Sequence, residues 1–261
     1  MNSIKQERGF SKERFFQVVK RLWILNQKKW LIGFAGGVGI LILIYLINAF
    51  GNFSPASSES GTIVGVAVVG LGLTLYKYGG YFLTSGIFNE LGKKSSASQM
   101  LTLPASNLEK FAAGWILTYL IYTTVVVGLL YITGIVLGIN PILTSQQLSD
   151  PVVNMSNIYF LDALLTFTAF HSVFFLGSIY FDGSNFLKTL LSIVVFFITV
   201  GILALIFFAA FSSESTEVVN LSFNMGFDPN NIVMTAAFFK IGVAFLFQFL
   251  SYRQLQNRQI A

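Results

Sequence analysis

Residues 189–211 read TLLSIVVFFITVGILALIFFAAF and contain no charged side chain. A helix needs roughly 20 mainly apolar residues to cross the hydrocarbon core of a bilayer, and this stretch is long enough. Comparable apolar stretches recur along the chain. The sequence therefore predicts an all-α integral membrane protein with six transmembrane helices, at 30–49, 62–84, 112–138, 158–181, 188–211 and 232–251.

The composition of the whole chain agrees with this prediction. Charged residues make up 10% and hydrophobic residues 54%, and the mean hydropathy is +0.72. Soluble domains carry about 25% charged residues because polar surface must cover their core. The predicted organisation is a cytoplasmic leader (1–29), a six-helix transmembrane domain (30–251) and a cytoplasmic tail (252–261).

Basic residues mark the two sides of the membrane. The sixteen lysines and arginines avoid the segments 50–61, 139–157 and 212–231, which lie between predicted spans. Basic segments stay cytoplasmic because translocating them is costly. Both termini are therefore predicted to be cytoplasmic. The high isoelectric point follows from this topology and from contact with anionic membrane lipids, and not from nucleic-acid binding.

The leader has the pattern of an amphipathic helix over residues 11–29. Ser11 can cap its start. Basic residues line one side, whereas the other side is apolar, with Phe15, Val18, Val19, Leu22 and Trp23 at helical spacing. A cationic face opposite an aromatic face is typical of a helix that lies in the membrane interface.

The loop 85–111 is predicted to be a short helix, a break and a second helix. Pro104 disfavours helical backbone at Leu103. Ser106 and Glu109 have the spacing of a capping box, so a new helix is expected to start near Asn107 and to run into the third span.

Several kinds of chemistry are missing from the chain. It has no cysteine and a single histidine, which excludes thiolate sites and two-histidine metal sites. The glycines before Gly92-Lys93-Lys94 do not have P-loop spacing. We therefore expect no enzyme activity, no metal and no cofactor bound by this chain.

Four ionisable residues fall within predicted spans: Lys77, Asp162, His171 and Lys240. Lys77 is close enough to the inner boundary for its side chain to reach water. Lys240 is deeper, and Asp162 lies at a depth that an extended lysine can reach. We expect these two to touch across the sixth and fourth spans, either as a structural pair or as part of a substrate path. A satisfied buried histidine is expected at His171 in preference to a proton relay.

The segment Leu101-Thr102-Leu103-Pro104-Ala105-Ser106-Asn107-Leu108-Glu109-Lys110-Phe111 resembles the end of the first cytoplasmic loop in membrane subunits of type-2 ABC transporters. A leucine–proline–small–serine segment is common there. The leader is similar to the connecting helix that precedes their first span. The likeness is greatest to the small permease-like proteins of Bacteroidetes, which implies a bacterial inner membrane.

The resemblance implies a permease subunit of an ATP-driven transporter, an exporter, with ATP bound by a separate ATPase subunit. A second permease subunit, identical or different, would complete the pathway. The residues implied in coupling to the ATPase are Glu90, Leu101, Leu103, Pro104, Ala105, Ser106, Glu109 and Lys110. Two alternatives stay open: a membrane scaffold or assembly protein with this fold and no transport, and a membrane enzyme.

Overall fold

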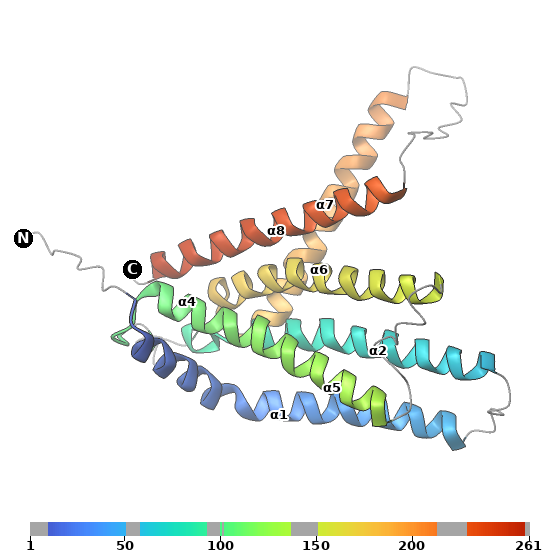
Figure 1. Cartoon of the computed structure of the whole chain (residues 1–261). Helices are drawn as coiled ribbons and strands as arrows, with labels where there is room; N and C mark the ends of the chain where they lie inside the picture. The colour runs from blue at the N-terminus through green and yellow to red at the C-terminus, as the bar shows by residue number, and fades with distance from the viewer. Residues whose placement is uncertain are drawn as a thin grey trace, which may run out of the picture.

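The computed structural model describes residues 10–50, 58–92, 100, 102–136, 151–212 and 229–258. Within these residues every regular element is helical, which confirms the all-α prediction (Figure 1). In chain order the elements are α1 (Lys12–Phe50), α2 (Ser58–Ser85), the 3-10 helix η1 (Asn89–Gly92), α4 (Asn107–Trp115), the π-helical segment η2 (Ile116–Ile121), α5 (Tyr122–Val136), α6 (Pro151–Tyr180), α7 (Asn185–Ser212) and α8 (Pro229–Arg258).

Four helical segments among the described residues are long and apolar enough to cross a membrane: Asn107–Ile132, Phe160–Tyr180, Asn185–Ala210 and Met234–Arg258. They contain most of the third to sixth predicted spans. The first and second predicted spans fall within α1 and α2, where the side chains of 44–45, 48–50 and 58–69 lie outside the described part. The chain is thus a helical protein with four candidate spans, and the count of six stays a prediction.

Helix α1 is continuous from Lys12 to Phe50, so the leader and the first predicted span form one helix with no break at 29/30. The side predicted to rest on the membrane packs largely against the protein itself, a contact that the sequence did not predict. Val18, Leu22 and Trp30 are buried in the protein core, and α1 packs along α4. A protein core and a lipid surface are both apolar, so the helical pattern cannot tell them apart.

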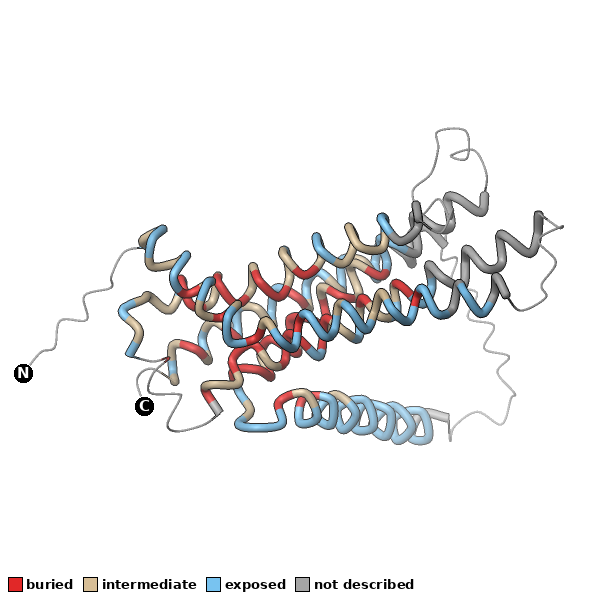
Figure 2. Tube along the Cα trace, turned by 90° about the horizontal axis from the view of Figure 1, so that it is seen from below, coloured by how far each residue is buried: buried red, intermediate tan, exposed pale blue. Residues whose placement is uncertain are grey.

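Aromatic side chains fill the centre of the bundle. Phe167 of α6 is fully buried, and its ring centroid lies 4.5 Å from that of Tyr76 on α2. The hydroxyl of Tyr122 donates to the carbonyl oxygen of Tyr76 at 2.8 Å. Gly80 lets these rings approach the backbone of α2, because a Cβ there would lie 2.7 Å from a ring carbon of Tyr122. Figure 2 shows the buried residues running through this bundle.

Helix α7 leaves the bundle soon after it begins (Figure 1). A turn at residues 181–184 separates it from α6, and Gly183 supplies the positive φ of 88° that this turn needs. Asn185 and Thr189 are buried against α6 and α2, but no residue in the most apolar window of α7 is buried. The helix therefore presents its apolar side chains outward around its whole circumference.

Helix α8 extends beyond the predicted end of the sixth span at 251. It continues to Arg258, and it packs along α6. Ser251 and Leu255 are buried, and the ring of Tyr252 lies 5.6 Å from that of Phe111 on α4. Most of the predicted tail is thus a packed helical end. The sequence pattern did not predict this extension, because the residues after 251 are mostly polar.

Candidate functional site: a polar junction at one end of the bundle

The capping box predicted at the start of α4 is present. The backbone N–H of Glu109 donates to Ser106 Oγ at 3.2 Å, and the backbone N–H of Ser106 donates to Glu109 Oε2 at 2.8 Å. The helix starts at Asn107, as expected. These reciprocal bonds satisfy two backbone donors that have no partner within the helix.

Glu109 also holds the beginning of α1, a contact that the sequence did not predict. Its Oε1 accepts hydrogen bonds from the backbone N–H of Ser11 at 2.7 Å and from Arg14 Nη2 at 3.2 Å. The carboxylate is fully buried, whereas the side chain of Arg14 is 28% exposed. Charge-assisted bonds of this kind are stronger than bonds between neutral groups. One carboxylate therefore joins the start of α1 to the start of α4.

A second ion pair joins α1 to η1. Arg21 Nη2 lies 3.3 Å from Glu90 Oε2, and both side chains are partly exposed. On either side of Glu90, Phe88 and Leu91 are buried in the main core. The short helix η1 is thus held by the apolar packing of Phe88 and Leu91 on one side and by Arg21 of α1 on the other.

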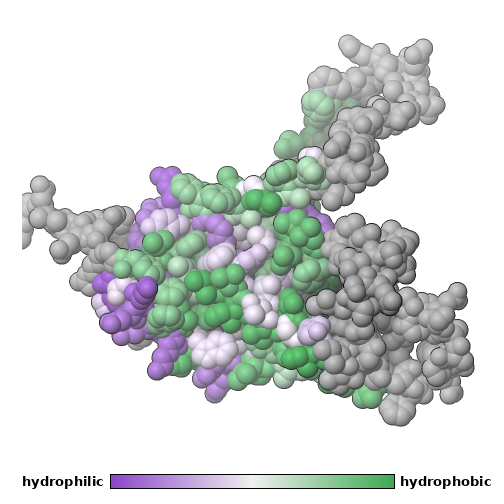
Figure 3. Space-filling view, in the orientation of Figure 1, coloured by the Kyte–Doolittle hydropathy of each residue, from purple (hydrophilic) through white to green (hydrophobic). Residues whose placement is uncertain are grey.

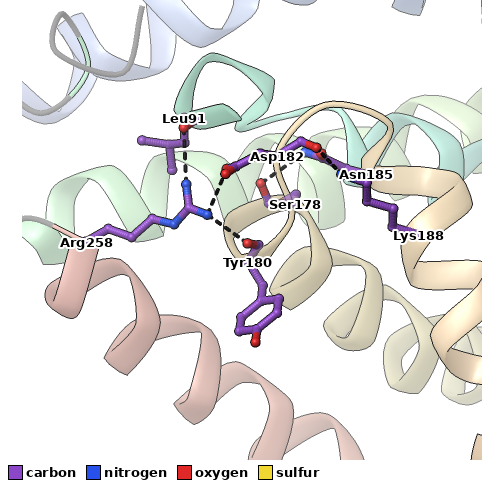
Figure 4. Close-up of polar contacts among 7 residues, drawn as sticks. All are labelled: Leu91, Ser178, Tyr180, Asp182, Asn185, Lys188 and Arg258. Atoms are coloured by element: carbon purple, nitrogen blue, oxygen red, sulfur yellow. Dashed lines mark hydrogen bonds and ion pairs between the residues drawn. The ribbon is translucent and has the colours of Figure 1, made fainter. Parts of the chain in front are cut away.

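Arg258 joins three parts of the chain at the end of α8 (Figure 4). Its Nη1 donates to the carbonyl oxygen of Leu91 in η1 at 3.1 Å. Its Nη2 donates to the carbonyl oxygen of Tyr180 at 2.7 Å and to Asp182 Oδ1 at 2.9 Å. A guanidinium can serve all three acceptors because its donors are fixed in one plane. Arg258 thereby connects η1 with the turn between α6 and α7.

We call these contacts of Glu109, Arg14, Arg21, Glu90, Arg258 and Asp182 the polar junction. They tie together the beginnings of α1 and α4, the helix η1, the turn before α7 and the end of α8. Figure 3 shows hydrophilic side chains gathered toward this end of the molecule and a largely hydrophobic band across the middle. That distribution is expected where helices leave a membrane.

The residues predicted to couple the chain to an ATPase differ in accessibility. Pro104 is exposed, and Leu103, Ala105 and Ser106 are partly buried. Glu90 is paired with an arginine of α1. Glu109 and Lys110 are buried, at 0% and 1% exposure, so they act within the chain and cannot meet a partner directly in this conformation. Leu101 lies outside the described residues.

The predicted contact between Lys240 and Asp162 is present. Lys240 Nζ donates to Asp162 Oδ1, joining α8 to α6. The carboxylate side chain is 60% exposed, so the pair lies at the side of the bundle. Lys77 is not part of this contact, and its side chain is partly buried on α2. The depth argument found the pair because each helix rises by a fixed amount per residue.

His171 is fully buried among aromatic rings, as the sequence favoured. Its Nε2 lies 2.9 Å from the hydroxyl oxygen of Thr118, within η2. That hydroxyl donates to the carbonyl oxygen of Gly114, so the imidazole donates to Thr118. Its Nδ1 has no hydrogen-bond partner among the described residues. Only one side of this histidine is therefore satisfied.

The described residues contain no group of three or more His, Cys, Asp and Glu side chains that could hold a metal ion. Comparison with protein-family models, with curated proteins and with solved structures finds no match to this chain. The sequence did not indicate that Ser11 and Arg14 would contact Glu109, that Arg21 would contact Glu90, or that Arg258 would contact Asp182. They meet their partners only after the helices pack.

Proposed function

We propose that this chain is the membrane-spanning permease subunit of an ATP-driven transporter of the ABC-2 type, an exporter powered by a separate ATPase. In this proposal six spans cross the inner membrane, both termini are cytoplasmic, and the cytoplasmic side carries the polar junction. The polar junction is the observation that supports this proposal, because through it the segment that resembles a coupling loop is hydrogen-bonded to helices that are proposed to enter the membrane.

The contacts give a route for mechanical coupling. Pro104 is exposed, and two residues later Ser106 caps α4 through Glu109. A partner that pushes on Pro104 would move the start of α4, and the buried carboxylate would pull the start of α1 with it. Through Arg21 and Glu90 the same movement would reach η1, and Arg258 would carry it to α8 and to the turn before α7. Packed helices respond to such a push as rigid bodies.

The outward apolar surface of α7 supports a pathway that needs a second permease subunit. No residue in the most apolar window of this helix is buried within the described part of the chain. Its surface suits lipid and a partner helix alike, because association in a bilayer depends on packing and not on apolar character. We place the second subunit along α7, as an identical or a related chain.

The test is co-purification of the tagged full-length chain with nucleotide-binding proteins from its own membrane. We expect an ATPase to be retained by the wild type and to be lost in Pro104→Arg, which places a charge on the exposed part of the loop. Gln17→Arg is the matched control, because Gln17 is exposed on α1 at the same end of the bundle. Failure to retain any ATPase would favour a scaffold. Retention by Pro104→Arg with intact ATP-dependent transport would disprove the coupling assignment.

A further inference from the structure

An apolar groove runs between α1, α2 and α5 and has a volume of about 480 Å³. Its walls are formed by Gly33 and Gly37 of α1, by Leu75 of α2 and by Val126 and Leu130 of α5, with further residues of the same kinds. Pockets that hold small organic ligands have volumes of roughly 300–1,000 Å³. The groove is therefore large enough for an extended hydrocarbon chain.

The glycines of α1 leave this groove open. A Cβ at Gly33, Gly36 or Gly37 would meet nothing within 4 Å, apart from the helix's own neighbouring residues. Gly33 and Gly37 are four residues apart and share one face of α1, a spacing that can bring helices together, but among the described residues this pair does not pack against another helix. Gly114 is the contrasting case, because a Cβ there would lie 2.6 Å from the ring of Phe88. The space along α1 is unfilled volume and not a close helix contact.

A second cavity of about 390 Å³ adjoins the groove at its Lys29 end. Lys29, Phe82 and Leu83 line both spaces. Buried polar side chains line the second cavity, among them Ser85 and Asn185, which are 2% and 3% exposed. Asn185 donates through Nδ2 to the carbonyl oxygen of Ser178, and its Oδ1 has no partner among the described residues.

The charge of the second cavity is positive. Lys29 is exposed on α1 and forms no hydrogen bond or ion pair with another described residue. No acidic residue lines the cavity. The amino end of α7 also borders it, and the N–H groups of a first helical turn favour a negative group. One cation with no counter-charge is complementary to a ligand with a single negative charge.

We infer that the two spaces together form a binding site for an anionic phospholipid of the phosphatidylglycerol type. One acyl chain occupies the groove along Gly33 and Gly37, and the phosphate lies at Lys29. The headgroup lies in the second cavity, beside the amino end of α7 and the side chain of Asn185. The site depends on the chain lying in a membrane, and it does not depend on transport or on an ATPase partner.

The ligand is chosen by its chemistry. The groove is apolar and the second cavity holds Lys29 with no acidic lining residue, so the ligand must have an apolar chain and a negatively charged headgroup. Phosphatidylethanolamine has the same chains and phosphate but no net charge, and diacylglycerol lacks the phosphate. Because Lys29 is the charged residue at the site, we expect affinity to fall in the order phosphatidylglycerol, phosphatidylethanolamine, diacylglycerol.

The test is native mass spectrometry of the purified full-length chain in detergent, titrated with each of these three lipids. Lys29→Gln is compared with Lys28→Gln, because Lys28 is the neighbouring exposed lysine and does not line either cavity. We expect Lys29→Gln to weaken phosphatidylglycerol binding about five-fold, which is the effect of one lysine at an anionic lipid surface. We expect Lys29→Gln to leave phosphatidylethanolamine binding nearly unchanged, and Lys28→Gln to leave the binding of all three lipids nearly unchanged.

A second pair of variants tests the groove. Gly37→Leu fills it, whereas Gly39→Leu makes the same change two residues along α1, at a position that does not line the groove. Neither Cβ meets a neighbour, so both variants can fold, which their thermal unfolding checks. We expect Gly37→Leu to lower binding of all three lipids at least ten-fold and Gly39→Leu to leave it unchanged. The site is disproved if the two glycine variants bind alike, if both lysine variants weaken binding equally, or if the wild type retains none of the lipids.

Discussion

The buried carboxylate of Glu109 gives the sharpest test of the polar junction. Replacing it by glutamine keeps the size of the side chain and removes the charge. The carboxylate accepts hydrogen bonds from the backbone N–H groups of Ser106 and Ser11 and from the guanidinium of Arg14. In Glu109→Gln one oxygen becomes an NH₂ group that faces a donor, so at least one of these bonds is lost.

The expected cost follows from the burial of the pair. A hydrogen bond to a charged group contributes about 1.5–3 kcal/mol, and breaking a fully buried ion pair costs about 3–5 kcal/mol. Arg14 keeps 28% of its side chain exposed, so water compensates for part of the loss. Glu109→Gln should therefore weaken the junction by about 2–3 kcal/mol.

Hydrogen exchange measured by mass spectrometry detects this loss of stability at the amides of the junction. Amides near residues 106–110 should exchange roughly 30–150-fold faster in Glu109→Gln, because each 1.36 kcal/mol corresponds to a factor of ten. Glu90→Gln is the control, since the carboxylate of Glu90 stays 20% exposed and its ion pair with Arg21 should contribute less than about 1 kcal/mol. Equal effects of the two changes, or unchanged exchange in Glu109→Gln, would refute the reasoning.

Three further experiments test contacts between the helices. Gly80→Ala should destabilise the bundle by about 1–3 kcal/mol, because the new methyl group meets aromatic rings, whereas Gly70→Ala, with open space at its Cβ, should leave thermal unfolding nearly unchanged. Lys240→Ala and Asp162→Ala should be non-additive by about 0.6–1.7 kcal/mol in a double-mutant cycle, and simple additivity would mean that the pair contributes nothing. Arg258→Lys should speed proteolysis of the turn at 181–184, since a lysine has one nitrogen where the arginine uses Nη1 for Leu91 and Nη2 for Tyr180 and Asp182. An unchanged rate would show that the contact does not hold this turn.

Local features of the sequence predicted local structure well. Ser106 and Glu109 are three residues apart, so their capping box depends on one turn of backbone and could be predicted from spacing. The contact of Lys240 with Asp162 was also predictable, because the depth of each residue follows from its count along an apolar helix. The buried position of His171 followed from its place within an apolar stretch.

Apart from the contact of Lys240 with Asp162, the contacts between distant segments could not be predicted in this way. Ser11 and Glu109 are 98 residues apart, and neither segment has a sequence feature that indicates contact with the other. The same is true of Arg258 and Asp182, which meet because α8 extends beyond its predicted end. The contact of the leader with α4 was not predicted, for a related reason. The leader's apolar side meets α4 in the protein, although the pattern alone fits lipid equally well.

The sequence by itself determined that the chain is helical and which stretches are apolar enough to enter a membrane, because both depend on short-range geometry and on the nature of each side chain. Tertiary structure alone decided that Gly33 and Gly37 border an open groove, that Glu109 is buried under the start of α1, and that α7 stands apart from the bundle. The sequence of an apolar or small residue does not show whether it will contact protein, lipid or an open space. Only the packing of the helices determines which of these it meets.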